Sequence, residues 1–137
     1  MSRFVLDCSV VLAWCFEDEG GRYAERVLAS LTQGEAVVPA IWPLEVVNAL
    51  LVAERGKRVK EADSVRFVSL LRSLPIEIDG ETATRAMGET MAIARRETLS
   101  AYDAAYLELA MRRGVPLATL DKTLKKATKR VGATLFG

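Results

Sequence analysis

Short β-like runs alternate with amphipathic helical stretches along the whole of this 137-residue chain. The β-like runs are Arg3 to Asp7 and residues 36–38, 76–78 and 117–119, with helical periodicity between them. Parallel strands need such crossover connections, so the alternation predicts a parallel α/β sheet covered by helices. Since the sequence contains neither a linker nor an internal repeat, we expect a single domain over residues 1–137.

The boundaries of the helices follow from residues that start or stop them. Pro43 suits the first turn of a helix, Ser100 suits an N-cap, and Gly114 suits a helix end. The helix from Leu44 to Arg55 is apolar on nearly all sides, which predicts either a central place in the core or a partner interface. The remaining expectations are helices at 10–16, 24–31, 60–74, 81–96, 101–113 and 122–130, a loop from Glu17 to Gly21, and an edge strand from Ala133 to Phe136.

The chain has no histidine. Ser-His-Asp and Cys-His catalysis, imidazole general bases and the usual histidine-ligated zinc sites are therefore excluded. Cys8 and Cys15 lie in one apolar segment and form no paired-cysteine metal or redox motif. Any acid, base or metal chemistry must consequently use carboxylates.

No segment of the sequence has the character of a membrane span or a secretory signal. The longest runs without a charged residue are nine residues, Cys8 to Phe16 and Ala36 to Leu44, whereas a spanning helix needs about 20 apolar residues. Asp7 interrupts the N-terminal apolar stretch, and no small-residue cleavage pattern follows it. We therefore expect a cytoplasmic protein that does not enter a membrane.

Four acidic residues are the candidates for chemistry. Asp7 ends the first predicted strand and is followed by another apolar run, where an unpaired carboxylate is costly to bury. Glu45 lies in the first turn of its helix, Asp103 is three residues after Ser100, and Asp121 directly precedes a basic helix. Each position also has a structural interpretation, as a helix cap or as a charge that interacts favourably with a helix dipole.

The predicted topology brings these four acids toward one another. Parallel strands end at the same edge of a sheet, which is where open α/β sheets bind their ligands. Carboxylates that converge repel one another unless protons or a cation compensate their charge. Mg²⁺ or Mn²⁺ fits a site made only of oxygen ligands, so the sequence predicts a divalent metal at this edge.

Four segments, in their order and spacing, give the chain a resemblance that covers nearly its whole length. They are Phe4–Ser9, Pro43–Leu50, Leu99–Leu107 and Leu117–Asp121. The set resembles the PIN domain family of nucleases, and in particular the VapC-type toxins of bacterial and archaeal toxin–antitoxin pairs. This resemblance implies a three-layer α/β/α fold with a parallel sheet of four to five short strands.

The resemblance also implies an activity and a site. It implies a metal-dependent endoribonuclease that uses Mg²⁺ or Mn²⁺ and leaves a 3′-hydroxyl and a 5′-phosphate at the cut. It further implies an RNA substrate, a VapB-type antitoxin as partner, and a homodimer. The residues implied for the site are the metal acids Asp7, Glu45 and Asp103, the fourth acid Asp121, and the supporting polar residues Ser9, Asn48 and Thr119.

The net charge of +1 conceals a split between the two parts of the chain. Residues 1–50 carry 3 basic and 7 acidic residues, whereas residues 51–137 carry 16 and 11. An acidic site beside a basic RNA-binding surface fits this split, and so does an ordinary solvated surface. The basic residues expected to contact phosphates are Lys122, Lys125, Lys126, Lys129, Arg130, Arg112 and Arg113.

Other functions agree less well with the residues. Asp7-x-Ser9 lacks the second aspartate of a haloacid-dehalogenase motif, and the first strand has no adjacent acidic pair of the receiver-domain type. No phosphate-cradling P-loop or dinucleotide-binding glycine motif is present. The alternative from a different class is a catalytically silent RNA-binding or interaction module, against which the intact set of acids argues.

Overall fold

The computed structural model describes residues 2–16 and 21–137. At its centre is a parallel sheet with the strand order β3-β2-β1-β4. The strands are β1 (Arg3–Leu6), β2 (Glu35–Val38), β3 (Ile76–Ile78) and β4 (Leu117–Ala118). This confirms the predicted parallel sheet of short strands, since helices connect every strand to the next.

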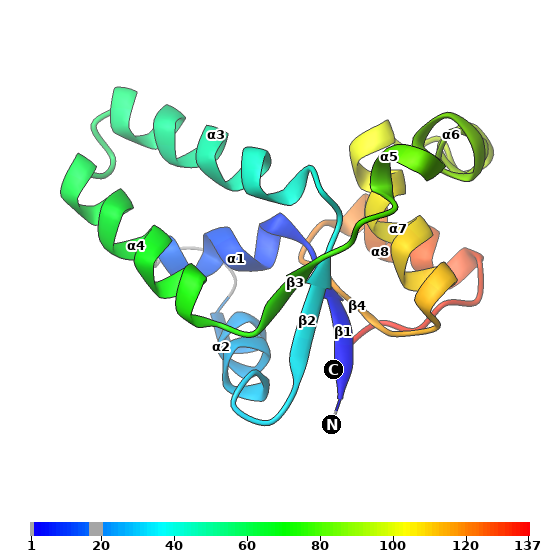
Figure 1. Ribbon diagram of the computed structural model, residues 1–137, viewed down its shortest axis with the longest axis horizontal. Coiled ribbons are helices and arrows are strands. Elements are labelled where there is room, and N and C mark those ends of the chain that lie inside the picture. Colours follow the sequence, from blue (N-terminus) through cyan, green and yellow to red (C-terminus); the bar gives the residue numbers. More distant parts are fainter. Residues whose placement is uncertain (1, 17–20) are drawn as a thin grey trace.

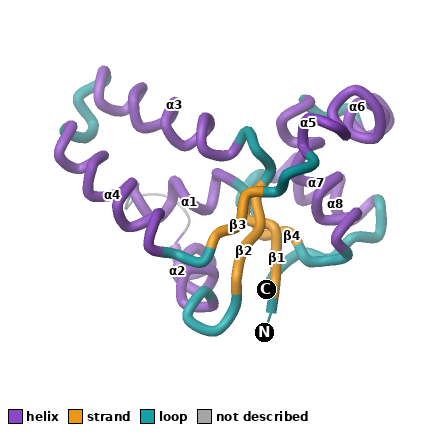
Figure 2. Tube along the Cα trace, in the orientation of Figure 1, coloured by secondary structure: helices purple, strands orange, loops and turns teal. Residues whose placement is uncertain are grey.

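Helices cover both faces of the sheet and make the three expected layers (Figures 1 and 2). On one side lie α1 to α4, and on the other lie α5 to α8 (Figure 1). The first group is α1 (Cys8–Cys15), α2 (Gly21–Ser30), α3 (Trp42–Arg55) and α4 (Glu61–Ser73). The second group is α5 (Thr82–Arg85), the π-helical turn η1 (Ala86–Thr90), α6 (Met91–Glu97), α7 (Ala101–Arg113) and α8 (Lys122–Arg130).

The core is centred on β1 and α7. Phe4, Val5 and Leu6 of β1 are fully buried, as expected for a central strand covered on both faces. In α7, all seven residues from Ala104 to Ala110 are buried, so this helix is enclosed rather than amphipathic. Tyr102, which the periodicity placed on the apolar face, is 61% exposed at the first turn of α7.

Helix α3 has one buried face and one exposed apolar face. Val46, Leu50 and Ala53 pack inward, while the exposed large residues of the same helix are Leu44, Val47, Leu51 and Val52. Of the two predicted roles, a central helix is therefore wrong, because a central helix would be buried all round. The exposed face remains a candidate partner surface.

Two expected elements differ in the structure, and one expectation falls outside it. The predicted helix over residues 81–96 is divided into α5, η1 and α6, with Gly88, a weak helix former, inside the π-helical turn. The predicted edge strand over residues 133–136 is reduced to a single bridge between Leu117 and Leu135. The predicted loop covers residues 17–20, which lie outside the described residues, and Gly21, which begins α2.

A buried ion-pair network fixes α7 against the end of β3. Asp79, only 2% exposed, accepts hydrogen bonds from Arg112 at 2.7 and 3.1 Å and from Arg113 at 3.1 Å. Arg112 also donates to Glu108, one turn earlier in α7, at 2.9 Å. Carboxylates within the protein already hold both guanidinium groups and would compete with RNA phosphates for them, so the expected RNA contacts of Arg112 and Arg113 stay a prediction.

No helix among the described residues is long and apolar enough to cross a membrane.

Candidate active site

The four candidate acids lie where helices begin beside the carboxyl ends of the strands. Asp7 follows β1 at the N-cap of α1, and Asp121 is the N-cap of α8. Glu45 and Asp103 lie in the first turns of α3 and α7. Figure 1 shows the beginnings of α1, α3 and α7 gathered above this edge of the sheet. The topology thus draws four distant parts of the chain to one region.

Asp7 is buried but is not a helix cap in the usual sense. Its side chain is 5% exposed and forms no capping hydrogen bond to α1. Instead, one carboxylate oxygen accepts hydrogen bonds from the hydroxyls of Ser9 at 2.6 Å and Thr119 at 2.8 Å. Burial raises the pKa of Asp7, the two hydroxyls and the backbone N–H of Ser9 oppose the rise, and the charge of Asp121 adds to it. The two hydroxyl hydrogen bonds, rather than capping of α1, are therefore the main interactions of this carboxylate.

Ser9 and Thr119 connect the ends of β1 and β4 around Asp7. The Ser9 hydroxyl accepts the backbone N–H of Leu120 at 2.9 Å, and the Thr119 hydroxyl accepts that of Asp121 at 3.0 Å. Each hydroxyl thus donates to Asp7 and accepts from a backbone N–H in the segment that follows β4. The two residues hold the Asp7 carboxylate in one orientation, as supporting groups around a metal ligand do.

Glu45 is held by a residue that sequence reasoning had assigned only to the core. The fully buried Tyr106 of α7 donates its hydroxyl proton to Glu45 at a distance of 2.5 Å. Burial raises the pKa of Glu45, the Tyr106 hydrogen bond opposes this, and the charges of Asp7 and Asp103 add to the rise. The available signal was spacing, since Tyr106 lies three residues after Asp103 and so on the same face of α7.

Asp103 has a strongly raised pKa although it is only partly buried. Burial, followed by the negative charges of Asp7 and Asp121, raises its pKa from 3.8 to about 6. The N-cap of α7 is Ser100, whose hydroxyl accepts the Asp103 backbone N–H at 3.1 Å. No donor among the described residues hydrogen-bonds to the Asp103 carboxylate itself. This carboxylate is therefore the one most available to an external cation.

Asp121 caps a helix and also acts on the other acids. Its carboxylate accepts the backbone N–H of Leu124 at 2.8 Å, so the capping interpretation is confirmed for this residue. Its charge nevertheless raises the pKa of both Asp7 and Asp103. Asn48 lies one turn after Glu45, but its side chain is exposed and forms no hydrogen bond within the described parts of the chain.

The donor set fits a hard cation, although the carboxylates do not surround a common point. Across residues 2–16 and 21–137, no three His, Cys, Asp or Glu side chains lie close enough together to hold one ion. Asp7, Glu45 and Asp121 are each occupied by hydrogen bonds within the protein. Burial, with the charges of Glu45 and Asp7, also raises the pKa of Cys8 to about 12, which keeps this thiol protonated. Only oxygen ligands remain.

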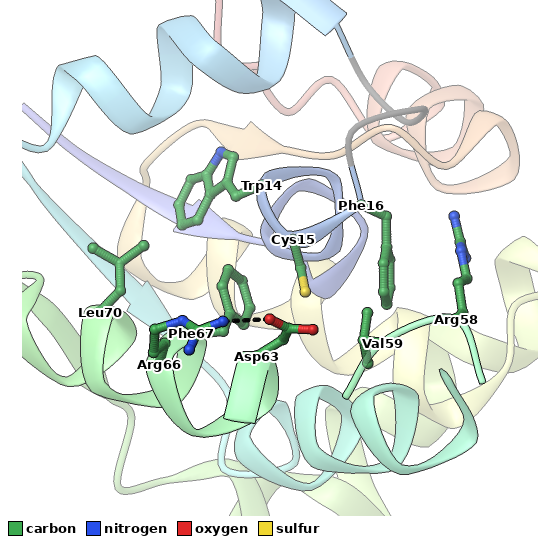
Figure 3. A pocket seen from close by; sticks show the side chains of 9 residues that line it. All are labelled: Trp14, Cys15, Phe16, Arg58, Val59, Asp63, Arg66, Phe67 and Leu70. Carbon is green, nitrogen blue, oxygen red and sulfur yellow. Dashed lines mark hydrogen bonds and ion pairs between the residues drawn. The ribbon is translucent and has the colours of Figure 1, made fainter. Parts of the chain in front are cut away.

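A large hollow in the structure lies away from these acids. Figure 3 shows a cavity of about 630 Å³ lined by residues from the end of α1, the α3–α4 connection and α4. Phe67 and Leu70 line it together with the ion pair of Arg66 and Asp63. None of the four candidate acids is among its lining residues. The site is defined by its charges, not by a deep pocket.

Comparisons with known proteins agree with this fold. A family model described as the PIN domain matches residues 4–130. Ribonuclease VapC3 of Pyrobaculum aerophilum is 25% identical over 122 residues, which are 89% of this chain and 92% of the relative.

Two solved structures share the fold. The PAE2754 structure from Pyrobaculum aerophilum has a TM-score of 0.71 and 24% identity, covering 96% of this chain and 87% of the other. VapBC2 of Rickettsia felis, bound to a DNA fragment from its promoter, has a TM-score of 0.69 and 15% identity, covering 98% of this chain and 97% of the other.

Proposed function

Since the chain belongs to the PIN domain family, we propose that it is a metal-dependent endoribonuclease and the toxin of a VapBC-type toxin–antitoxin pair. The observation that carries this proposal is the mutual electrostatic repulsion at the sheet edge. The pKa values of Asp7, Glu45 and Asp103 are all raised, in each case by burial and by at least one of the other acids. Carboxylates arranged in this way lack only a cation to compensate them.

In the proposed site, Asp7, Glu45 and Asp103 would hold Mg²⁺ or Mn²⁺ once their side chains move together around it, with Asp121 as the fourth acid. A bound divalent cation supplies an activated water and neutralises charge that develops on the scissile phosphate. The chain's own contribution is to fix its ligands: Ser9 and Thr119 orient Asp7, and Tyr106 orients Glu45. Asn48, which is exposed, keeps its proposed supporting role on the basis of the resemblance alone.

The activity is tested by incubating the purified protein with defined single-stranded and structured RNAs. Mg²⁺ or Mn²⁺ is expected to support endonucleolytic cleavage, and a chelator is expected to stop it, because the four acids repel RNA phosphates when no metal is bound. Products are sized and their ends identified. Robust cutting by metal-free protein, with trace metal and contaminating nucleases excluded, contradicts the mechanism. Metal binding without cleavage of any RNA would instead support a silent RNA-binding module.

We also propose a small VapB-type antitoxin and a second copy of the chain as partners, each covering a different apolar surface. The first surface is a groove between α3 and α4, formed by two adjoining cavities of about 590 and 280 Å³ that share Val47, Val68 and Arg72. In its walls Trp42 Nε1 and Ser64 Oγ are buried and have no hydrogen-bond partner within the described residues. A segment with an apolar face would fill this groove. Leu44, 72% exposed, does not line the groove and is left for the homodimer.

Two substitutions on α3 separate these partners. Leu51→Asp, inside the groove, is expected to weaken antitoxin binding at least tenfold while self-association persists, because it places a charge on an apolar contact surface. Leu44→Asp is expected to do the reverse. Sedimentation velocity of each variant, alone at micromolar concentration and with antitoxin, measures both. A strictly monomeric wild type contradicts the homodimer, and equal effects of both variants on antitoxin binding contradict the groove assignment.

A further inference from the structure

The four lysines of α8 differ from the other basic residues near the site because no described carboxylate forms an ion pair with them. Arg130 donates to Glu97 at 2.9 Å, and Arg112 and Arg113 are held by the Asp79 network. By contrast, no described carboxylate forms an ion pair with the four lysines of α8, which are Lys122, Lys125, Lys126 and Lys129. The helix packs through Leu124, Ala127 and Thr128, which leaves the lysines on its outer side.

A second helix adds a cation to the same surface. The ring of Tyr23, in α2, has the guanidinium of Arg26 5.6 Å from its centre and the ammonium of Lys125 5.8 Å from its centre. Both distances lie within the range of cation–π attraction. Tyr23 is itself fixed, since its hydroxyl donates to the carbonyl of Phe136 at 2.9 Å. One aromatic ring therefore gathers cations from two helices that are about 100 residues apart in sequence.

This surface is continuous with the acidic site. Helix α8 begins directly after Asp121, so Lys122 is the first residue beyond that acid. The backbone of Thr119, whose side chain donates to Asp7, lies beside the Tyr23 hydroxyl: burial raises the pKa of Tyr23, and the Thr119 backbone opposes this rise. Lys122, Lys126 and Lys129 share one face of α8, with neighbours about 4.5–6 Å apart along the axis. The cations therefore extend away from the acids as a row.

We propose that Arg26, Lys125, Lys126 and Lys129, here called the basic strip, bind the phosphodiester backbone of RNA next to the scissile bond. The inference rests on the proposed ribonuclease function and assigns the path of the substrate on either side of the cut. Unpaired like charges at regular intervals suit a regularly charged strand, which carries one phosphate per nucleotide. The basic strip lies next to the acids, and an RNA strand that crosses the site must continue past it on both sides. This position favours a nucleic acid strand over an acidic protein segment as the ligand.

The strip is tested by measuring RNA binding in the presence of a chelator, which prevents cleavage. The repulsion between the RNA and the four acids is then the same for wild type and variants, so a difference in affinity comes from the strip. A fluorescent single-stranded RNA of about 20 nucleotides is titrated by anisotropy at several salt concentrations. Arg26→Gln and Lys129→Gln are each expected to weaken binding about fivefold near 0.1 M salt and to lower the salt slope by about 0.7. The double variant is expected to lose about 25-fold, since the two helices then bind the same strand.

Arg55→Gln is the matched control. Arg55 is exposed and lies in the last turn of α3, as Lys129 lies in the last turn of α8, so both substitutions remove a favourable helix-dipole interaction. Unchanged affinity and salt slope for the strip variants, or an equal effect of Arg55→Gln, would overturn the proposal. Normal RNA binding together with loss of an acidic protein partner would assign the strip to that partner instead. Strip-dependent binding without metal-dependent cleavage would sink the proposed function while leaving the binding surface in place.

Discussion

Asp7→Asn and Asp103→Asn are each expected to reduce metal-dependent RNA cleavage roughly a hundredfold or more. The metal-free variants are expected to be at least as stable as the wild type, so activity and stability move in opposite directions. A residue that serves only as a helix cap would behave differently, because asparagine caps a helix about as well as aspartate.

The expected stability follows from the sign of the pKa shifts. Asparagine retains an oxygen that accepts from Ser9 and Thr119, but it carries no buried charge at position 7. For Asp103, a folded pKa of about 6 against 3.8 means that the ionised carboxylate destabilises the folded state above pH 6. At pH 7 this cost is between about 1 and 3 kcal/mol, and it vanishes below pH 4, where the carboxyl is protonated in both states. The gain of Asp103→Asn should follow the same pH dependence.

Thermal melting with and without Mn²⁺, paired with RNA cleavage, measures both effects. Wild-type protein at a metal concentration 100 times its Kd gains about 2.7 kcal/mol, and the two variants should lose most of this gain. Asp63→Asn is the matched control, because Asp63 occupies the same third position of α4 that Asp103 occupies in α7, in a capping box away from the acids. Wild-type cleavage and an undiminished metal shift in both site variants would leave Asp7 and Asp103 as structural residues.

Much of the fold was predictable because local signals and tertiary packing agree. The apolar run of β1, the Ser100 cap of α7 and the Asp121 cap of α8 are all found where the sequence predicted them. The π-helical turn was not predictable, since residues 81–96 have ordinary helical periodicity and only Gly88 weakens it. The isolated bridge at Leu135 depends on packing of the C-terminal segment, where Phe136 lies 4.4 Å from the ring of Phe4.

The position of the candidate acids was predictable from topology, but their environment was not. Strand order and helix starts bring Asp7, Glu45, Asp103 and Asp121 to one edge because parallel strands must end together. Periodicity showed that Tyr106 is buried, yet it gave no indication that the hydroxyl reaches Glu45, 61 residues away. Likewise, the sequence pattern gave Arg112 and Arg113 as candidates for phosphate contacts and gave no indication that both pair with Asp79. Pairwise contacts across such separations are set by packing rather than by local pattern.

Asp79→Asn is expected to destabilise the protein by about 3 kcal/mol, which corresponds to a fall in Tm of roughly 10 °C for a domain of this size. Asp79 is almost fully buried, and three hydrogen bonds from Arg112 and Arg113 reach its carboxylate. Removing its charge leaves the partly buried Arg112, 14% exposed, with Glu108 as its main remaining partner. Breaking a buried ion pair on one side costs more than the pair contributes, because the other charge stays desolvated.

The same carboxylate makes stability depend on acid pH, with a defined direction. Arg112, with Arg113 in support, lowers the pKa of Asp79 from 3.8 to about 2 against the opposing effect of burial. Because the folded pKa is lower than the unfolded one, the stabilisation of about 2 kcal/mol is complete above pH 5 and is lost as the pH falls from 4 to 2. The difference in urea-unfolding free energy between wild type and Asp79→Asn should therefore be constant from pH 5 to 7 and shrink toward pH 2.

Glu81→Gln tests whether the stability cost of Asp79→Asn comes from the burial of Asp79 or only from the loss of an ion-pair partner of Arg112. Glu81 also lies near Arg112, at 3.5 Å, but its side chain is 53% exposed, so its removal is expected to cost less than about 1 kcal/mol. If Asp79→Asn cost no more than Glu81→Gln, the network would be a surface feature and α7 would be held by its apolar packing alone. If the larger cost is observed, the network is what fixes α7, and with it Asp103 and Tyr106, against the end of β3. Part of the order of the candidate site would then depend on a contact at the opposite end of the helix that carries it.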